Sequence, residues 1–379
     1  MANNKTFKIK NGLQAGRYLG SNGTETADTV VYDLAGASYD SVSFSIASQE
    51  TSPSDIFFKS DGTKMYVIGT TGDDVNEYNL TTAWNISTAS YNQNFSISGQ
   101  DTSPRGLFFK PDGTKMYVTG TSGDSVYEYN LSTAWDVSSS SYQQSFSVIS
   151  QVGATQGLFF KPDGTKMYVL DSSGDDANEY NLSTAWNIST ASYVQNFSVA
   201  PQEVNPSGFF FKPDGTKMYV IGTTGDDVNE YNLSTSWDIS TGSYLRSFSV
   251  ASQDTGPVGL FFKPDGTKMY MVGYTTDAVY QYSTALLTQT LDLSTGGTFS
   301  FTPSGATTVS LTNPPASGTA VGFTLEVINT GGYALTWPSS VKWPSGTAPT
   351  ATASKELYTF VTTDGGTTYY GKLSGSNIQ

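Results

Sequence analysis

Apolar and polar residues follow one another along this chain in a pattern that returns every 51 residues. Residues 106–110 (Gly-Leu-Phe-Phe-Lys) are almost wholly apolar, and residues 115–118 (Lys-Met-Tyr-Val) follow them across a Pro-Asp-Gly turn. Residues 126–131 and 144–148 instead alternate apolar and polar side chains. Continuous apolar runs are typical of strands covered on both faces, and alternation is typical of half-exposed strands. The pattern therefore predicts units of four β-strands, with exposure increasing from the first strand to the fourth.

The clearest sign of the repeat is the string Lys-x-Asp-Gly-Thr-Lys-Met-Tyr, which occurs five times. Its aspartates are Asp61, Asp112, Asp163, Asp214 and Asp265. First, second and third strand patterns also occur five times, between residues 54 and 283. Four-stranded units of about 50 residues indicate the blades of a β-propeller rather than a solenoid.

The fourth strand pattern also occurs five times, but its first copy, at 41–46, precedes every other strand. The last unit loses the repeat after Tyr282, and Thr288 stands where a tryptophan is due. We therefore expect 41–46 to complete the last blade. This closes an all-β, five-bladed propeller that has no free sheet edge. An open array of five sheets is the alternative.

Residues 1–37 and 288–379 lie outside the repeat. Closure of the ring places both ends of the propeller side by side, so these flanks should meet. Similar phrases, Tyr32-Asp33-Leu34 and Leu291-Asp292-Leu293, stand on the two sides. The sequence predicts a small β-sandwich-like domain made of 1–37 and 288–379, with the propeller at 38–287 inserted into it. Trp337 or Trp343 should lie in its core.

Composition excludes several kinds of chemistry. The 379 residues contain no cysteine and no histidine, which excludes disulfides, thiolate nucleophiles, Cys/His zinc sites and histidine acid–base catalysis. A net charge of −14 argues against nucleic acid as a partner. No apolar run approaches the ~20 residues that span a bilayer, and no signal peptide is evident. We expect a soluble protein made in a cytoplasm, without membrane insertion, metal or cofactor.

One face of the predicted propeller collects the turns between second and third strands and the connections between blades. Each blade places an aspartate and a glutamine there, and an acid follows four of the glutamines. This ring could bind cations or polar ligands such as sugars; the alternative is that these residues serve turn geometry alone. The candidates are Asp73, Asp124, Asp175, Asp226, Asp277, Gln49, Gln100, Gln151, Gln202 and Gln253, with Glu50, Asp101, Glu203 and Asp254 beside them.

The opposite face collects ten lysines, two per blade, which either dock onto an acidic surface or lie at solvated hairpin tips. In both cases we expect one acidic and one basic face. The lysines are Lys59, Lys64, Lys110, Lys115, Lys161, Lys166, Lys212, Lys217, Lys263 and Lys268. Four tryptophans in the long loops, Trp84, Trp135, Trp186 and Trp237, either stack on sugars or cover the gaps between blades.

Two resemblances add to this interpretation. The repeated Pro-Asp-Gly-Thr-Lys-Met-Tyr-Val stretch resembles the YVTN-type propeller repeats of surface-layer proteins, over about 240 residues. Residues 336–349, 358–360 and 363–366 resemble a terminal domain of bacteriophage virion proteins, such as tail fibres and capsid-associated proteins. The opening at 7–13 is similar to the start of phage structural proteins. The second resemblance implies a virion component, made in the host cytoplasm.

We therefore expect a non-enzymatic virion structural protein, either a capsid decoration or a tail appendage. Its flanking domain would anchor it to other virion proteins or in a homo-oligomer, and its propeller would face the host surface, including host glycans. The alternatives are a lectin-like module and a glycoside hydrolase. A hydrolase needs one fixed pair of carboxylates, and near-identical blades give no carboxylate a distinct environment.

Overall fold

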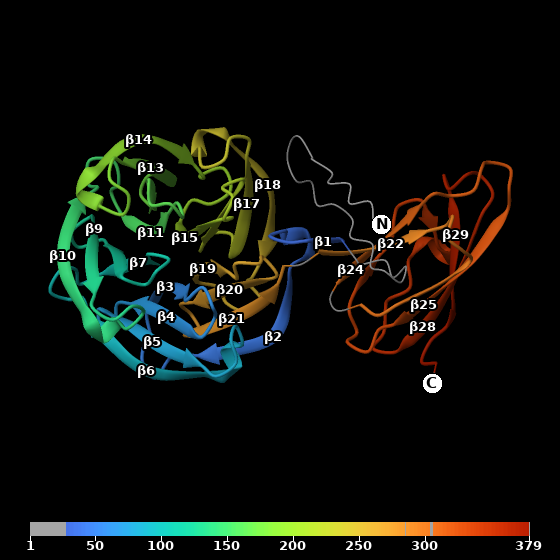
Figure 1. The fold of residues 1–379 in the computed structure, drawn as a ribbon, viewed down its shortest axis with the longest axis horizontal. Helices are drawn as coiled ribbons and strands as arrows, with labels where there is room; N and C mark the ends of the chain where they lie inside the picture. The colour runs from blue at the N-terminus through green and yellow to red at the C-terminus, as the bar shows by residue number, and fades with distance from the viewer. Residues whose placement is uncertain (1–27, 285, 304–305, 379) are drawn as a thin grey trace, which may run out of the picture. The chain divides into compact units, whose positions relative to one another are not determined.

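The computed structural model describes residues 28–284, 286–303 and 306–378. Contacts divide them into two compact units, one from Tyr32 to Thr284 and one made of the described residues on either side. Both units consist of β-strands with short 3₁₀ turns (Figure 1). Among the described residues, no helix is long and apolar enough to cross a membrane. The opening at 7–13, on which part of the second resemblance rests, lies outside the described residues.

The larger unit is a five-bladed propeller in which each blade is a four-stranded antiparallel sheet, and the first strands surround the centre (Figure 1). Blade 1 contains β3 (Pro53–Phe58), β4 (Lys64–Gly69), β5 (Asp74–Leu80) and β6 (Ala89–Ser96). Blade 2 contains β7 (Pro104–Phe109), β8 (Lys115–Gly120), β9 (Ser125–Leu131) and β10 (Ser140–Ser147). Blade 3 contains β11 (Thr155–Phe160), β12 (Lys166–Asp171), β13 (Asp176–Leu182) and β14 (Ala191–Ser198). Blade 4 contains β15 (Pro206–Phe211), β16 (Lys217–Gly222), β17 (Asp227–Leu233) and β18 (Gly242–Ser249).

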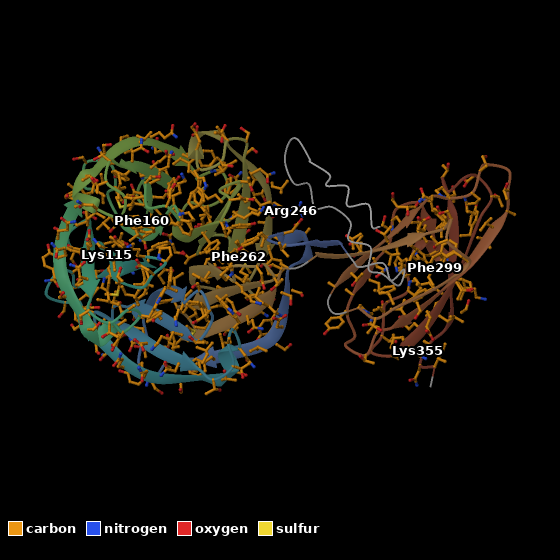
Figure 2. All side chains as sticks on the ribbon, in the orientation of Figure 1. Lys115, Phe160, Arg246, Phe262, Phe299 and Lys355 are labelled. Carbon is orange, nitrogen blue, oxygen red and sulfur yellow. The ribbon has the colours of Figure 1, made fainter. Side chains whose placement is uncertain are left out.

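Blade 5 closes the ring with a strand from the other end of the propeller. It contains β19 (Pro257–Phe262), β20 (Lys268–Gly273), β21 (Ala278–Ser283) and β2 (Ser38–Ser45). β2 pairs antiparallel with β21, and Phe44 lies opposite Val279. The expected closure is confirmed, and the open array is excluded. Burial follows the predicted gradient, since first strands are almost wholly buried and fourth strands alternate. Side chains fill the space between the blades (Figure 2).

The hairpin turn between first and second strands is built for a close contact. In blade 2 the Asp112 carboxylate accepts a hydrogen bond from the Thr114 N–H at 3.0 Å. Gly113 has a φ of 72°, which favours glycine. A Cβ atom on Gly113 would also lie 2.3 Å from the Trp135 indole, so no larger residue fits.

The four tryptophans cover the gaps between blades, as one of the two interpretations held. The Trp135 ring of blade 2 lies 6.5 Å from Phe57 and 6.4 Å from Tyr66, both in blade 1. The same ring lies 5.5 Å from Phe109 of its own blade. The Tyr66 hydroxyl donates to the Trp135 carbonyl at 2.8 Å. Short 3₁₀ helices follow these loops: η2 (Ile86–Thr88), η3 (Val137–Ser139), η4 (Ile188–Thr190) and η5 (Ile239–Thr241).

Tyr32 replaces the missing fifth tryptophan. Its N–H donates to the Gly266 carbonyl at 3.0 Å, as that of Trp135 does to Gly113. η1 (Leu34–Gly36) follows it, and Asp33 pairs with Arg246, which Figure 2 labels, at 3.0 Å. The propeller unit therefore runs from Tyr32 to Thr284 rather than from 38 to 287. The assignment of Tyr32-Asp33-Leu34 to the flanking domain was wrong, because Tyr32 takes the tryptophan position of the fifth blade. The match is hidden in the sequence because Tyr32 stands 52 residues before Trp84, one more than the repeat.

The second unit has two sheets around one core. One sheet has the order β1-β22-β24-β26, and the other has the order β23-β25-β28-β29-β27. β1 precedes the propeller and pairs with β22 after it, so the propeller is inserted into this unit. Leu291 and Val309 of the first sheet share a core with Phe323 and Phe360 of the second. The strands are β1 (Asp28–Val30), β22 (Leu286–Asp292), β23 (Thr298–Phe301), β24 (Thr307–Thr312), β25 (Val321–Ile328), β26 (Leu335–Thr336), β27 (Val341–Lys342), β28 (Lys355–Thr362) and β29 (Tyr369–Gly375), with η6 (Pro344–Gly346).

Both candidate tryptophans reach this core. Trp337 and Trp343 lie 5.1 Å apart edge to face, and both pack against Tyr358 and Phe360. Each is half-buried rather than buried, so they cover one side of the core.

Candidate functional site

The predicted ring of aspartates lies in the turns between second and third strands, on what we call the aspartate face. All five have a positive φ, between 39° and 51°, a conformation that Asp adopts more readily than most residues. Their backbone carbonyls accept bonds from the next outer loop, as Asp73 does from the Ile97 N–H at 2.8 Å. The other four are Asp124, Asp175, Asp226 and Asp277. Turn geometry therefore explains the residue type in every blade.

The predicted glutamines lie beside these turns, and three of them contact tyrosines of the third strands. The Oε1 atoms of Gln100, Gln202 and Gln253 each accept a hydrogen bond from a tyrosine hydroxyl at 3.3 Å. Gln49 is half-buried and Gln151 is exposed. The structure thus brings glutamine and aspartate to one face, as predicted, but three of the glutamines are engaged within the fold.

The acids that follow the glutamines are buried and hold the loops together. Glu203 is fully buried, and its carboxylate accepts from the N–H groups of Asn205 at 2.7 Å, Thr224 at 3.2 Å and Gly225 at 3.1 Å. Glu50, Asp101 and Asp254 make equivalent bonds. Charge-assisted bonds to backbone N–H groups are stronger than neutral ones. These carboxylates therefore stabilise loops rather than present themselves to ligands.

In blade 3 a carboxylate also accepts from the N–H groups of the loop, but it comes from a different position in the repeat. Val152 stands where the other blades have an acid, and Asp171 stands where they have a glycine. Asp171 accepts from the N–H groups of Gly153 at 3.2 Å, Ala154 at 3.0 Å and Ser173 at 2.9 Å. In blade 2 a Cβ atom on Gly120 would lie 2.2 Å from the Asp101 carboxyl carbon. Acid and glycine are therefore a matched pair, and one carboxylate fits per loop.

Neighbouring carboxylates on this face influence one another. Burial raises the pKa of Asp73, and Asp101 and Glu50 raise it further. The pKa of Asp277 is raised in the same way by burial and then by Glu50 and Asp254. In the part of the chain that the structure describes, no group of three or more acids is arranged to hold a metal ion. The face is acidic, but its carboxylates are dispersed around the ring.

The opposite face, which carries the first hairpin turns and the tryptophan loops, is called the hairpin face. Every one of its ten lysines pairs with a carboxylate, so the expectation of a basic face was wrong. The tip lysines pair with the turn aspartates at 2.6–2.8 Å in Lys59–Asp61, Lys110–Asp112, Lys161–Asp163, Lys212–Asp214 and Lys263–Asp265. The inner lysines pair in Lys64–Glu77, Lys115–Glu128, Lys166–Glu179, Lys217–Glu230 and Lys268–Asp40.

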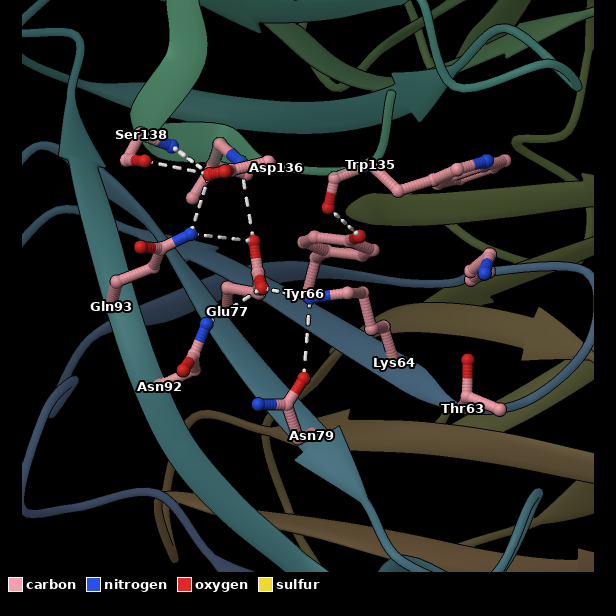
Figure 3. A network of polar contacts seen from close by, with 12 residues as sticks. Thr63, Lys64, Tyr66, Glu77, Asn79, Asn92, Gln93, Trp135, Asp136 and Ser138 are labelled. Carbon is pink, nitrogen blue, oxygen red and sulfur yellow. Dashed lines mark hydrogen bonds and ion pairs between the residues drawn. The ribbon is translucent and has the colours of Figure 1, made fainter. Parts of the chain in front are cut away.

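The inner pairs join neighbouring blades (Figure 3). Glu77 of blade 1 is fully buried and receives bonds from Lys64, from Asn92 at 2.9 Å and from Gln93 at 3.2 Å. It also accepts from the Val137 N–H of blade 2 at 3.1 Å. A buried carboxylate needs such partners to offset its desolvation. The lysines and glutamates of this face therefore hold the ring together.

The axis of the propeller contains a cavity of about 270 Å³ that the sequence analysis did not predict. Five phenylalanines, one from the first strand of each blade, line it edge to face in a closed ring, with centroids 5.1–5.5 Å apart. They are Phe57, Phe108, Phe159, Phe210 and Phe261. Exposed prolines of the hairpin turns, such as Pro111, also line the cavity, so it reaches solvent on the hairpin face.

Asp55 is the charged residue that lines this cavity. Its exposed fraction is 7%, and its two oxygens accept from the N–H groups of Leu107 at 2.9 Å and Ile56 at 2.8 Å. Burial raises the pKa of Asp55 to about 8, although these two donors lower it. The other blades have glycine at this position, at 106, 157, 208 and 259. That departure from the repeat is the signal that could have identified Asp55.

A second hollow, of about 470 Å³, lies between blades 2 and 3 on the hairpin side. Its lining is part polar and part apolar, and it includes Lys115, Glu128, Asn130 and Gln143, with Trp186 at one side. Gln144 within it donates to Glu128 at 2.8 Å and to Asn187 at 2.9 Å.

No family model matches the sequence, and no curated protein matches it. Solved structures with a similar fold include a candidate 6-phosphogluconolactonase of Bacteroides uniformis, with 14% identity and a TM-score of 0.40 over 60% of this chain and 66% of that one. A protein from Lactobacillus plantarum has 15% identity and a TM-score of 0.41, over 61% and 67%. A periplasmic gluconolactonase of Pseudomonas aeruginosa has 14% and 0.37, over 61% and 66%. This chain thus spans about two thirds of their length, and the likeness concerns the fold alone.

Proposed function

We propose that this protein is a non-enzymatic structural component of a bacteriophage particle, a capsid decoration or tail appendage that displays its propeller. The observation that carries the proposal is the use of the repeated charged groups. Lysines of the hairpin face are paired with carboxylates, and the acids beside the glutamines of the aspartate face hold backbone amides. These charged groups therefore stabilise a rigid, closed propeller.

The flanking unit supplies the phage part of the proposal. Its stretch at 336–349 resembles the terminal domain of virion proteins, and it has a core of its own. Five near-identical blades offer little asymmetric surface for a unique contact. The flanking unit therefore anchors the protein to other virion proteins or in a homo-oligomer, and the propeller faces outward.

Purified particles test this proposal. Particles from a culture that produces the protein are labelled with gold-conjugated antibody against the propeller and analysed by mass spectrometry. We expect the chain to co-purify with particles and the label to lie on their outer surface. Recovery of the chain only in the particle-free fraction would refute the proposal.

A glycoside hydrolase is disfavoured by the axis of the propeller. Such enzymes use two carboxyl groups about 5–10 Å apart on either side of the sugar bond. Among the described residues that line the axial cavity, Asp55 is the one carboxyl. We expect the purified protein to leave bacterial surface polysaccharides uncleaved, measured by reducing-end release.

A glycan-binding role is the second candidate, and the hollow between blades 2 and 3 favours it. Amide and charged groups such as Asn130, Gln143 and Lys115 are the kind that orient sugar hydroxyls. A glycan array with the wild-type chain and with the Gln143→Ala variant tests it. Binding that the variant weakens would support this role, and binding that persists unchanged would place the site elsewhere.

A further inference from the structure

Asp55 breaks the symmetry of the propeller at the one place where all five blades meet. Its side chain lies between β19 and β7, where the glycines of the other blades allow the first strands to approach closely. A Cβ atom on Gly208, for example, would lie 2.7 Å from the Val258 carbonyl oxygen. In such a tight position the ionised form of a carboxyl group needs a compensating interaction, because burial of an isolated charge is costly.

The described residues provide that carboxyl with two hydrogen-bond donors but no counter-ion. No ion pair joins Asp55 to another residue in the described part of the chain. The nearby titratable residues contact other groups. Arg105 of β7 donates from Nη2 to the Ser103 hydroxyl at 3.4 Å, and its Nε has no hydrogen-bond partner among the described residues. Lys64 of β4 pairs with Glu77, and Tyr66 donates to the Trp135 carbonyl. β19 carries no titratable residue.

The cavity that Asp55 lines is apolar and large enough for a small organic molecule. A cavity of about 150 Å³ in a protein core accommodates benzene, and this one measures about 270 Å³. The five phenyl rings each meet their neighbours edge to face, so they present a continuous hydrocarbon wall to the cavity. Such a wall suits the apolar part of a ligand.

These features select among the possible ligands. Calcium takes six to eight oxygen ligands, and here a single carboxyl faces hydrocarbon. An anion would be repelled by the ionised Asp55, and a neutral hydrocarbon would gain nothing from that charge. A positive head group on an apolar body satisfies both the carboxylate and the phenyl rings.

We propose that the axial cavity binds a small organic ammonium ion, of the alkyl- or arylalkylammonium class. The charged nitrogen contacts the Asp55 carboxylate, and the hydrocarbon part lies among the five phenylalanines. The ligand enters from the hairpin face, past the exposed prolines. This site is independent of the proposed role in a virion, and either can fail without the other.

The affinity depends on pH because the site requires the ionised carboxyl. With a pKa of about 8, Asp55 is largely protonated at pH 7 and largely ionised at pH 9. An alkylammonium ion resembles the lysine side chain, whose pKa is about 10.4, and stays charged over this range. Binding should therefore be about tenfold weaker at pH 7 than at pH 9. At pH 7, binding of the ligand should also release a proton from the Asp55 carboxyl.

The experiment is calorimetric titration of the full chain with n-butylammonium at pH 9 and pH 7, with 1-butanol as the neutral analogue. The variants are Asp55→Gly, which restores the residue of the other four blades, and Asp55→Asn, which keeps the size of the side chain. Asp73→Asn removes a carboxylate outside the cavity and serves as the matched control. Circular dichroism confirms that each variant is folded.

We expect 1:1 binding of n-butylammonium at pH 9, about tenfold weaker binding at pH 7, loss of binding in both Asp55 variants, and unchanged binding in Asp73→Asn. Absence of binding at pH 9 would overturn the proposal. So would equal binding of 1-butanol, which would make the cavity a purely apolar site, or binding that either Asp55 variant retains.

Discussion

Carboxylates on the hairpin face of the propeller pair with lysines, whereas the buried acids beside the glutamines of the aspartate face accept from backbone amides. Glu128 is joined to Lys115 on the first face, and Glu203 holds three N–H groups on the second. The difference follows from the loops. Hairpin tips satisfy their own backbone through a tight turn, and the connections between blades leave amides that need an acceptor. The same residue type therefore joins blades on one face and shapes loops on the other.

The largest effect should come from removing an inner lysine of the hairpin face. In Lys115→Met the buried carboxylate of Glu128 loses its counter-ion, and its desolvation is no longer offset. Lys115 is about a quarter exposed, so water replaces part of the interaction. We expect a loss of about 3 kcal/mol in the free energy of unfolding at pH 8, measured by urea denaturation. A loss in the free energy of unfolding no larger than the contribution of an exposed ion pair would show that Lys115 does not stabilise the buried Glu128 carboxylate.

The matched pair in blade 3 tests the aspartate face. Asp171→Gly leaves the amides of Gly153, Ala154 and Ser173 without their acceptor, and we expect a loss of about 2–3 kcal/mol. The double variant Val152→Asp, Asp171→Gly reproduces the arrangement of blade 2 and should recover most of that loss. Val152→Asp alone places two carboxylates where one fits and should destabilise the blade. Additive effects in this double-mutant cycle would contradict the loop-stabilising role.

Asp55 is a third kind of carboxyl, which has amide partners but little exposure to water. Its folded-state pKa of about 8 lies above the ordinary value of about 3.9, so between these pH values the folded chain holds a proton that the unfolded chain has lost. This group therefore makes the wild type less stable as pH rises from about 4 to about 8. Relative to the wild type, Asp55→Gly should gain stability steadily as the pH rises from about 4 to about 8. If the free energies of unfolding of the two proteins change in parallel with pH, the pKa of Asp55 is not raised in the folded chain.

The smallest effect should come from a hairpin tip. Lys110 and Asp112 form an exposed pair at 2.7 Å, and exposed pairs contribute little. We expect Lys110→Met to change the free energy of unfolding by at most about 0.5 kcal/mol. Because Lys110 and Lys115 lie on one blade and one face, this variant is also the control for Lys115→Met. A large effect here would mean that the tip pairs also hold the ring together.

Much of the fold could be predicted from the sequence, and the parts that could not are those that depart from the repeat. The period of 51 residues and the early strand around Phe44 predicted a closed ring, because register and closure follow from counting. Tyr32 escaped notice because it fills the place of a tryptophan at a different spacing and with a different ring. The ten lysines predicted a basic face because the partners of the inner lysines, such as Glu77, lie on other strands. The tip lysines have their partners two residues away, as in Lys59–Asp61, and only the structure shows that these neighbours pair.

By itself the sequence determined the four-stranded blades, their number, the strand that closes the ring and the β-rich flanks, since these depend on local patterns and on their repetition. The tertiary structure alone decided which partner each charged side chain has. Whether a carboxylate meets a lysine, a backbone amide or a hydrocarbon wall depends on atoms brought together from different strands and blades. Asp55 shows this most directly. In the sequence it is one change from glycine, and in the folded ring that change places an acid in the lining of the axial cavity.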